Sequence, residues 1–546
     1  MTIRENVEAI AANAEVLKGR TVDDLIKSAR QNPSDDIARS VMAAAGGNAS
    51  FDIASAALKA MGISDEAVSN LNKVISTSTG LVAYDLQAPA KNLYPVATPI
   101  RNRVPRVGGG VGTATNWRQV NAIIGSGYDA ISWVPEGQRA GQMSYSTSNK
   151  SASYATLGEE DAVSYEAISA SAGFEDVQAR MTMRLMQKVF LKEEFAILGG
   201  NSSLQLGTPS APTLSAAGSG ATLPALTYSV IVVALGIEGY ANASKTTGAL
   251  SIPYSKTVTG ADGKTFIING GSSNKSSNST QAVTLGQTLS ATVPAIQGAV
   301  AYAWFVGASG SETLQAITTI NSATFAAALT AGQQAATTIT QDSSTNTNGF
   351  NGIYTTAAIA ANGAVFNTQA TGTAGTGTVL TASGKGSVNE IDNLLLSMWT
   401  QYQISPSVLY VNAQELRNIT TKCLTNATAP LLQYFADPKA GEIRLTAGGT
   451  IDFYFNPFAL DGGIKIPVKI HPNVPPGTIV AWCENLPAQY ASNEVPNVAE
   501  VKTRKEFYQI DWPITTRQRQ VGVYVEEVLA IYAPFGVSVL TNIGNG

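Results

Sequence analysis

The stretch FAILGGNSSLQLGTPSAPTL, Phe195 to Leu214, joins two different kinds of sequence. It begins as the end of a charged amphipathic helix and finishes in a Gly/Ser/Pro-rich segment almost without charge. From Leu204 to Gly349 only eight of 146 residues are Asp, Glu, Lys or Arg, whereas the other 400 residues carry the remaining 66. The composition therefore predicts at least two domains, and it leaves open whether they follow one another or whether one interrupts the other.

The overall composition is that of a folded chain. With 546 residues, 44% of them hydrophobic, the chain is long enough for two to four domains with substantial cores. Its net charge of −4 argues against a protein that binds a nucleic acid duplex through many phosphate contacts, because such proteins carry an excess of Lys and Arg. The N-terminus lacks the apolar core of a secretory signal, and no apolar run reaches the roughly 18 residues that span a bilayer. We therefore expect a protein made and kept in a cytoplasm, with no membrane partner.

Residues 1–110 are predicted to be an N-terminal helical segment followed by an arm. Short Ala-rich helices are expected up to about residue 75, and Ser64 is placed to cap one of them. The arm that follows is extended, is punctuated by prolines and ends in the glycine run Gly108, Gly109 and Gly110. Because glycine permits backbone angles that other residues avoid, we expect a hinge at these three residues.

Residues 111–170 are predicted to form one long β-hairpin, an extended loop. Apolar and polar residues alternate from Asn116 to Ala170 on both sides of a polar stretch, Glu136 to Ser153. This stretch is expected to be a mobile tip that carries Arg139 and Lys150.

Residues 171–203 contain the clearest helical pattern in the chain. Apolar side chains recur at helical spacing from Phe174 to Leu198, a span of about 37 Å at 1.5 Å per residue. Gly199 and Gly200 are expected to end this helix through a left-handed cap.

The low-charge segment, residues 204–349, is all-β in character. The stretches LTYSVIVVAL and AVAYAWFVG place Tyr228 and Val230, then Tyr302 and Trp304, on one face of a strand each, and turn residues separate the strands. Repeated short strands of this kind predict a β-sandwich. The segment resembles the immunoglobulin-like and fibronectin type III modules that decorate phage structural proteins.

Residues 350–546 return to a charged, mixed α/β pattern. Ser387 with Glu390, and Asn412 with Glu415, are spaced as capping boxes at the start of two amphipathic helices. Between these helices PSVLYV predicts a short buried strand, and the C-terminal part predicts strands and turns that end in PFGVSVLTNI.

The order of these segments resembles the major capsid protein of tailed phages, the Hong Kong 97 phage fold. The stretches that carry the resemblance are WVPEGQRAG through EEFAILGGNSS, then GFNGIYTTAA and PSVLYVNAQEL. The resemblance implies an α+β fold with an N-terminal arm, an extended loop, a spine helix, and peripheral and axial domains over 350–546. It also implies that LGGNSS and GFNGI are neighbours, so that the low-charge module interrupts the capsid domain between Gly200, Asn201 and Gly349, Phe350. Insertions at a surface turn are tolerated, and the module is expected to stand off the outer face of a shell.

The resemblance also implies how the chain functions. A hairpin about 50 residues long cannot bury its apolar face alone, and the arm needs a partner to order it, so many copies are expected to cover one another in hexamers and pentamers. Further implied partners are a portal, scaffolding and a cement protein, with weak, non-specific contact to packaged double-stranded DNA. The expected location is the virion capsid, assembled in the host cytoplasm.

No residue pattern predicts an enzyme, a cofactor or a metal site. His471 is the only histidine, and its neighbouring prolines indicate a loop and no catalytic role. The carboxylates at 159–161 and 526–527 are expected to be solvated or salt-bridged at subunit contacts. Cys423 and Cys483 are expected to be buried thiols. The run GGGVGTAT lacks the Lys-Ser/Thr of a phosphate-binding loop.

Two alternatives remain open at this point. The first keeps the fold and changes the cargo, giving an encapsulin-type shell around enzymes, from which a capsid would be distinguished by its nucleic acid content. The second is a surface adhesin or glycan-binding protein that uses the β-sandwich, and it would be a monomer that binds sugars.

Overall fold

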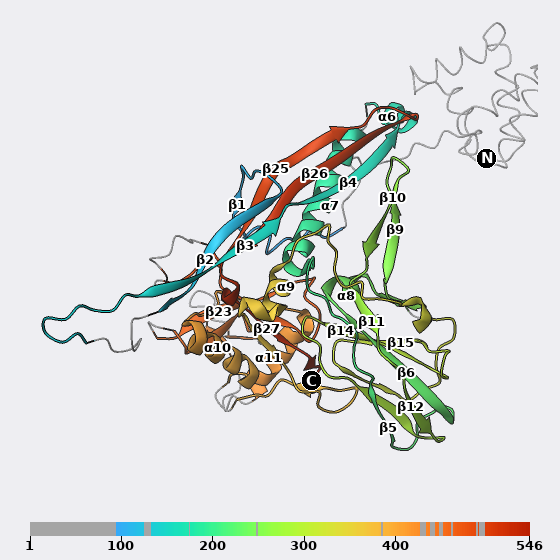
Figure 1. Cartoon of the computed structure of the whole chain (residues 1–546). Coiled ribbons are helices and arrows are strands. Elements are labelled where there is room, and N and C mark those ends of the chain that lie inside the picture. Colours follow the sequence, from blue (N-terminus) through green and yellow to red (C-terminus); the bar gives the residue numbers. More distant parts are fainter. Residues whose placement is uncertain are drawn as a thin grey trace, which may run out of the picture. The chain divides into compact units, whose positions relative to one another are not determined.

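The computed structural model describes residues 94–124, 133–173, 175–246, 249–383, 386–425, 433–436, 443–446, 451–459, 462–487, 490 and 497–546. The chain divides into two compact units, Met1–Lys91 and Asn92–Gly546. The helices expected for residues 1–75 lie outside the described residues. The second unit is a mixed α+β structure in which strands predominate (Figure 1).

A four-stranded sheet and one long helix form the first layer of this unit. The sheet has the order β1-β25-β26-β4, with β1 parallel and the other neighbours antiparallel. Its strands are β1 (Arg106–Val107), β4 (Ala155–Ser164), β25 (Ala499–Asp511) and β26 (Gln518–Ile531), and a short helix α6 (Tyr165–Ala170) follows β4. The helix α7 (Val177–Gly199) packs against the sheet through Met181, Leu185 and Val189, which share a small core with Val521, Val523 and Val525.

The long helix begins and ends differently from the sequence prediction. Asp176 caps it by accepting hydrogen bonds from the N–H groups of Gln178 and Ala179, so the helix starts after the expected Phe174. The left-handed cap predicted at Gly199 and Gly200 is wrong, because Gly200 has φ −54° and ψ 142°, an extended conformation. These glycines are needed for close packing instead. A Cβ on Gly200 would lie 2.6 Å from the carbonyl oxygen of Phe350.

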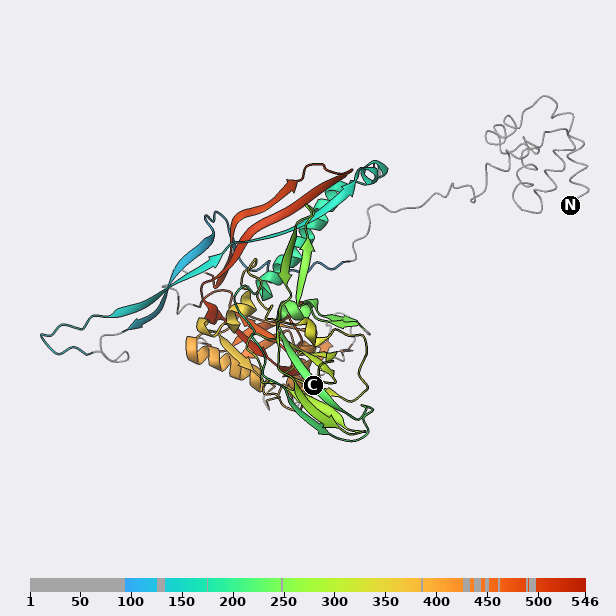
Figure 2. The same cartoon turned by 45° about the vertical axis from the view of Figure 1, so that its right-hand side comes forward.

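The extended loop is a hairpin of two strands, shorter than predicted. Strands β2 (Ala114–Ile124) and β3 (Ser144–Ser153) pair antiparallel and extend away from the four-stranded sheet (Figure 2). The prediction of a single hairpin over 116–170 is wrong in its second half, because the pairing of β3 with β2 ends at Ser153 and β4, which begins at Ala155, pairs with β26 near the C-terminus. The alternating pattern identified strands in this region but not their partners.

A six-stranded sheet with three helices forms the second layer. Its order is β17-β27-β24-β19-β23-β22. The strands are β17 (Val365–Thr368), β19 (Val408–Val411), β22 (Phe453–Asn456), β23 (Ile464–Ile470), β24 (Ile479–Trp482) and β27 (Val537–Thr541). The helices are α9 (Ile353–Ala358), α10 (Asn389–Tyr402) and α11 (Ala413–Thr425). The buried strand predicted from PSVLYV is confirmed as β19.

The two predicted capping boxes are not formed. Glu390 accepts a hydrogen bond from the Thr381 N–H, and the N-cap of α10 is Val388. Asn412 does accept from the Gln414 N–H, but Glu415 is buried and accepts from the Gly477 N–H instead. Glu390 therefore binds a backbone N–H nine residues earlier and Glu415 one 62 residues later, which the capping-box spacing does not reveal.

The low-charge segment forms two facing sheets, as its strand pattern predicted. One has the order β11-β6-β14-β15 with β12 also paired to β6, and the other has the order β16-β13-β5. The strands are β5 (Thr213–Ala217), β6 (Leu226–Leu235), β11 (Ser272–Lys275), β12 (Ser279–Val283), β13 (Thr288–Thr292), β14 (Ala301–Gly307), β15 (Thr313–Thr318) and β16 (Ser322–Phe325). Tyr228, Val230, Tyr302 and Trp304 lie in the core between the sheets.

Smaller elements complete the described residues. They are α8 (Ile237–Asn242), the strand pairs β7 (Ser244–Thr246) with β8 (Ala249–Ser251) and β9 (Ser255–Thr259) with β10 (Thr265–Asn269), the pair β18 (Thr378–Val379) with β28 (Ile543–Gly544), the pair β20 (Gln433–Ala436) with β21 (Ile443–Thr446), and the 3-10 turns Ala336–Thr338, Ala360–Asn362 and Pro534–Gly536.

The low-charge module is packed firmly against the rest of the unit. The second face of β6 and β14, with Ile231, Val233 and Phe305, belongs to the main hydrophobic core together with Ile197 and Tyr354. The central strands are thus buried on both faces, as their near-continuous apolar sequences allow. The module is therefore continuous with the body of its own chain, and its place on the outer face of a shell stays a prediction.

A buried pair of amides holds the module at a second place. The Asn321 N–H donates to Oδ1 of Asn542 at 2.8 Å, and Nδ2 of Asn542 donates back to Oδ1 of Asn321 at 3.1 Å. Asn542 has φ 63°, a left-handed conformation that asparagine tolerates better than most residues. This reciprocal contact joins the start of β16 to the chain between β27 and β28.

We predict that Phe305→Ala destabilises the whole unit and not the module alone. The buried ring faces the main core, so its truncation is expected to lower the free energy of unfolding by about 3–5 kcal/mol. Urea unfolding followed by tryptophan fluorescence and by far-UV circular dichroism should report one shared transition. Leu285→Ala, at a residue that is 78% exposed, serves as the control. Separate transitions for the two signals would contradict the prediction.

Candidate functional site

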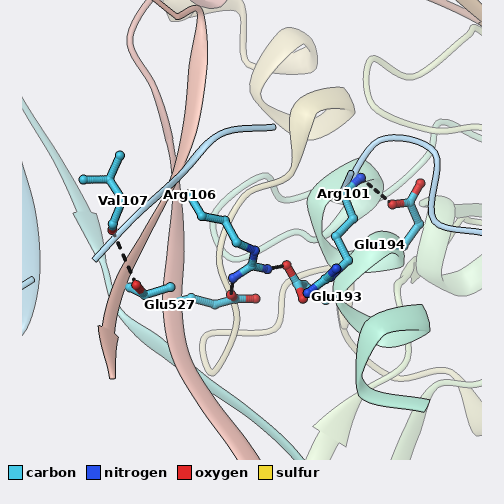
Figure 3. Close-up of polar contacts among 7 residues, drawn as sticks. Arg101, Arg106, Val107, Glu193, Glu194 and Glu527 are labelled. Carbon is cyan, nitrogen blue, oxygen red and sulfur yellow. Dashed lines mark hydrogen bonds and ion pairs between the residues drawn. The ribbon is translucent and has the colours of Figure 1, made fainter. Parts of the chain in front are cut away.

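The arm is fixed to the body by a turn at its end. Ile100 and Val104 are buried in the main core, and the turn places the N–H groups of Ile100 and Arg101 on the carboxylate of Glu194 at 2.9 and 2.6 Å (Figure 3). Glu194 lies near the end of α7 and is fully buried. The expectation that the arm needs a second copy to order it is therefore wrong for this segment, whose partners lie within its own chain.

Two arginines of the arm form ion pairs with two further buried carboxylates. Nε of Arg101 lies 2.7 Å from Glu193, and Arg106 forms ion pairs with both Glu193 and Glu527 (Figure 3). Both glutamates have no exposed side-chain area. Burial lowers the pKa of both arginines, while the nearby Glu527 raises it again. We call Arg101, Arg106, Glu193, Glu194 and Glu527 the ionic cluster.

His471 joins the ionic cluster from the loop after β23. Its Nε2 lies 2.5 Å from Oε1 of Glu194, and its Nδ1 accepts the N–H of Asn473 at 3.1 Å. The ring is fully buried and lies edge-on to Tyr410. The sequence analysis placed His471 in a loop with no catalytic role and did not predict its burial. The expectation that Glu527 is solvated or salt-bridged at a subunit contact is wrong, because it is buried and pairs with Arg106 of its own chain. Glu526 is bound by Arg504, which lowers the pKa of Glu526.

The glycine run after the arm lies against the sheet. Gly109 has φ 82°, the left-handed region that favours glycine. Gly110 donates its N–H to the Thr503 carbonyl at 3.0 Å, and a Cβ at this position would overlap the ring of Tyr154. A Cβ on Gly108 would lie 3.0 Å from the Glu506 carboxylate. In this conformation the run fits closely between β25 and Tyr154, and its role as a hinge stays a prediction.

The β2–β3 hairpin exposes large apolar side chains. Trp133 is 91% exposed, and Met143 and Tyr145 are each 65% exposed. Arg139 lies in the described segment between the two strands and is exposed. Lys150 is not at the tip as predicted, because it lies in β3 opposite Trp117 near the base of the hairpin. There Trp117 packs edge-on against Tyr532.

Charges of opposite sign lie on the hairpin and on β4. The described hairpin carries Arg118, Arg139 and Lys150 against the single acid Glu136. The strand β4 and helix α6 carry Glu159, Glu160, Asp161 and Glu166, and no Lys or Arg. Some of these acids are partnered, since Lys192 pairs with Glu159 and Arg517 pairs with Glu166. We call residues 155–170 the acidic strip.

The two ends of the low-charge module lie side by side. The Asn346 N–H donates to the Asn201 carbonyl at 2.7 Å, and the Gly352 N–H donates to the Gly200 carbonyl at 2.8 Å. Phe350 is buried in the main core, and Gly349 closes a turn on Asn346. LGGNSS and GFNGI are therefore adjacent in space although the module separates them in sequence.

Metal-binding clusters, free cysteines and membrane-spanning helices were sought among the described residues. Within them there is no group of three or more His, Cys, Asp or Glu side chains that could hold a metal ion. The prediction that Cys423 and Cys483 are buried thiols is confirmed, and burial raises the pKa of Cys483 to about 12, so it carries little thiolate. No helix in the described part of the chain is long and apolar enough to cross a membrane.

Comparisons with solved structures find phage-type capsids at low similarity. The capsid of a native GTA particle has a TM-score of 0.38 and 8% identity, and the match covers 87% of this chain and 100% of that one. The capsid of Myoviridae phage XM1 has a TM-score of 0.37 and 8% identity, covering 86% and 99%. The holo-SrpI encapsulin complex from Synechococcus elongatus PCC 7942 has a TM-score of 0.20 and 13% identity, covering 33% and 53%. No family model and no curated protein matches the chain.

We predict that Arg101→Met strongly destabilises the protein. The substitution keeps the length of the side chain but leaves Glu193 buried with Arg106 as its remaining cation, and breaking a buried ion pair in this way costs about 3–5 kcal/mol. The free energy of unfolding in urea measures the effect. Arg504→Met, which breaks an ion pair at the surface, should leave the unfolding midpoint nearly unchanged. Equal effects of the two substitutions would contradict the assignment.

Gly200→Ala tests the packing at the module junction. The new methyl group would meet the carbonyl oxygens of Phe350 and Ala196, so we expect a loss of about 1–3 kcal/mol in unfolding free energy. Gly236→Ala is the matched control. Its added Cβ would lie 3.6 Å from the nearest atom, the Gly271 carbonyl oxygen, and its φ of −73° is one that alanine adopts readily. A tolerated Gly200→Ala would show that this glycine is not required for the close contact.

Proposed function

We propose that this chain is the major capsid protein of a tailed double-stranded DNA phage, and that many copies assemble into an icosahedral shell around the genome. The observation that carries this proposal is the β2–β3 hairpin with its exposed Trp133, Met143 and Tyr145. A two-stranded hairpin is marginally stable in water by itself, and large exposed apolar side chains mark interaction surfaces. Repetition of one contact around a closed symmetry would cover the hairpin of every copy.

Charge complementarity supports a second copy as the partner of the hairpin. Residues 114–153 carry three bases and two acids, Asp129 and Glu136, so the hairpin has one net positive charge, whereas the acidic strip on β4 and α6 carries four acids and no base. The strands β2 and β3 extend away from the four-stranded sheet that contains β4 (Figure 2). The hairpin of one copy is therefore proposed to lie along the acidic strip of the next.

The remaining segments take their proposed roles from this arrangement. Residues 1–110 form the N-terminal segment and arm, 111–170 the extended loop, 171–203 the spine helix, and 350–546 the peripheral and axial domains of a Hong Kong 97-like fold. Gly109, with its positive φ, is the residue where the extended loop would adapt to five-fold and six-fold surroundings. The partners are other copies, a portal, scaffolding and a cement protein, with weak contact to DNA inside a virion assembled in the host cytoplasm.

The module over 204–349 is proposed to be an immunoglobulin-like insertion. In support, a sheet with the order β12-β6-β14-β15 faces a smaller sheet over one apolar core, and the ends of the segment lie side by side. The burial of both faces of β6 and β14 means that the insertion folds together with the capsid domain.

Charge reversal on the hairpin tests the proposal. The double variant Arg118→Glu/Arg139→Glu should place acids opposite the acidic strip of the next copy and reduce the assembled fraction at least about tenfold, which corresponds to ~1.4 kcal/mol. Electron microscopy and sedimentation velocity measure particles against free subunits. Adding Glu160→Lys and Asp161→Lys should restore assembly.

Lys256→Glu, at an exposed lysine of the module in β9, is the control and should assemble like the wild type. A wild-type protein that remains a folded monomer at all concentrations would overturn the proposed function. Particles of the double variant that form as readily as the wild type would overturn the proposed contact surface.

A further inference from the structure

The ionic cluster contains one more acid than it has bases. Its acids are Glu193, Glu194 and Glu527, and its bases are Arg101 and Arg106. His471 does not supply the missing positive charge, because its Nδ1 accepts the Asn473 N–H and so carries no proton, while Nε2 donates to Glu194. Since a buried unpaired charge is strongly disfavoured, one carboxyl in the cluster must hold a proton to balance it.

The hydrogen bonds of the three glutamates differ in a way that locates this proton. Glu194 accepts two backbone N–H groups and the imidazole of His471. Glu193 pairs with both arginines. Glu527 has a single contact to Arg106 at 3.2 Å, and within the described residues its Oε1 is buried without any hydrogen-bond partner. Of the three carboxyl groups, Glu527 therefore has the fewest hydrogen-bond donors and cations to stabilise a negative charge, so it is the one expected to hold the proton.

We propose that Glu527 is protonated when the arm is docked, and that loss of this proton as the pH rises releases the arm segment 98–107 from the body. The inference does not depend on the chain forming a shell. In the docked state Glu193 and Glu194 balance the two arginines, and Glu527 is neutral. When Glu527 ionises, the cluster holds an unbalanced negative charge out of water, and undocking of the arm would let solvent reach it.

The surroundings of Glu527 agree with this assignment. It is fully buried on β26, directly opposite Thr503 of β25 and Ala155 of β4, neither of which is charged. The charged groups that face it are Arg106 and Arg101 from the arm, with Glu193 of α7 behind Arg106. The exposed Glu506 of β25 acts on Arg106 and competes for its charge.

Burial raises the pKa of Glu527, and the two arginines offset only part of this rise. An acid whose pKa is higher in the folded state than in the unfolded chain stabilises the fold less as the pH rises through its folded pKa. The docked arm should therefore be most stable at low pH and weaken as the pH rises from the ordinary glutamate pKa toward the raised pKa of docked Glu527. Over that interval the docking equilibrium falls by roughly tenfold per pH unit because one proton is linked, and above it the equilibrium changes no further.

Hydrogen exchange of arm amides in the full-length protein tests the proposal. The amides of Ile100, Arg101 and Gly110, and that of Val501, which donates to the Pro105 carbonyl, report whether the arm is docked. After correction for the intrinsic exchange rate, their protection in the wild type should fall as the pH rises above about 5, just above the ordinary glutamate pKa, and level off once Glu527 is ionised in the docked arm. In Glu527→Gln, whose neutral amide mimics the protonated acid, protection should remain constant over the same range.

Glu526→Gln is the matched control on the neighbouring residue, which is paired at the surface, and it should keep the wild-type pH dependence. Arm protection that does not change with pH in the wild type would overturn the proposal without any variant. A Glu527→Gln protein that follows the wild-type profile, or that has an undocked arm already at pH 6, would overturn it equally, since the neutral side chain should hold the arm.

Discussion

The burial of three glutamates against two arginines from the arm is the constraint on which the described unit depends. Glu193 and Glu194 lie at the buried end of α7, and Glu527 lies in the middle of the four-stranded sheet. Without Arg101 and Arg106 these carboxylates would be left out of water with no cation, a state far less stable than the folded one. The arm from Ile100 to Arg106 is thus part of the fold. It brings the helix, the sheet and the loop at His471 to one point, and the β2–β3 hairpin begins only a few residues beyond it.

Buried contacts also hold the low-charge module to the rest of the unit. A module joined only by two flexible ends would move independently, as segments attached through loops do. Here β6 and β14 form a sandwich core on one face and enter the main core on the other, and the Asn321–Asn542 pair fixes a remote edge. The module therefore adds to the rigidity of the body that presents the hairpin.

Sequence patterns predicted the local elements well and their partners poorly. The strands from LTYSVIVVAL and PSVLYV and the long helix follow from periodicity, because each depends on residues close in the chain. The pairing of β4 with β26, the extended exit at Gly200 and the ionic cluster depend on residues that lie between 92 and 421 positions apart, which no local pattern encodes. One signal was available for the docked module. The apolar run VIVVAL lacks the alternation of a strand with one wet face, which indicates burial on both sides.

An experimental structure of the purified protein tests directly whether the ionic cluster is closed and the hairpin is covered by a neighbouring copy. Electron cryomicroscopy should show particles in which the ionic cluster is closed in each copy and the side chains of Trp133, Met143 and Tyr145 are covered by the neighbouring copy. A monomer whose hairpin folds back over its own body, or particles in which the arm lies away from Glu193 and Glu527, would contradict it.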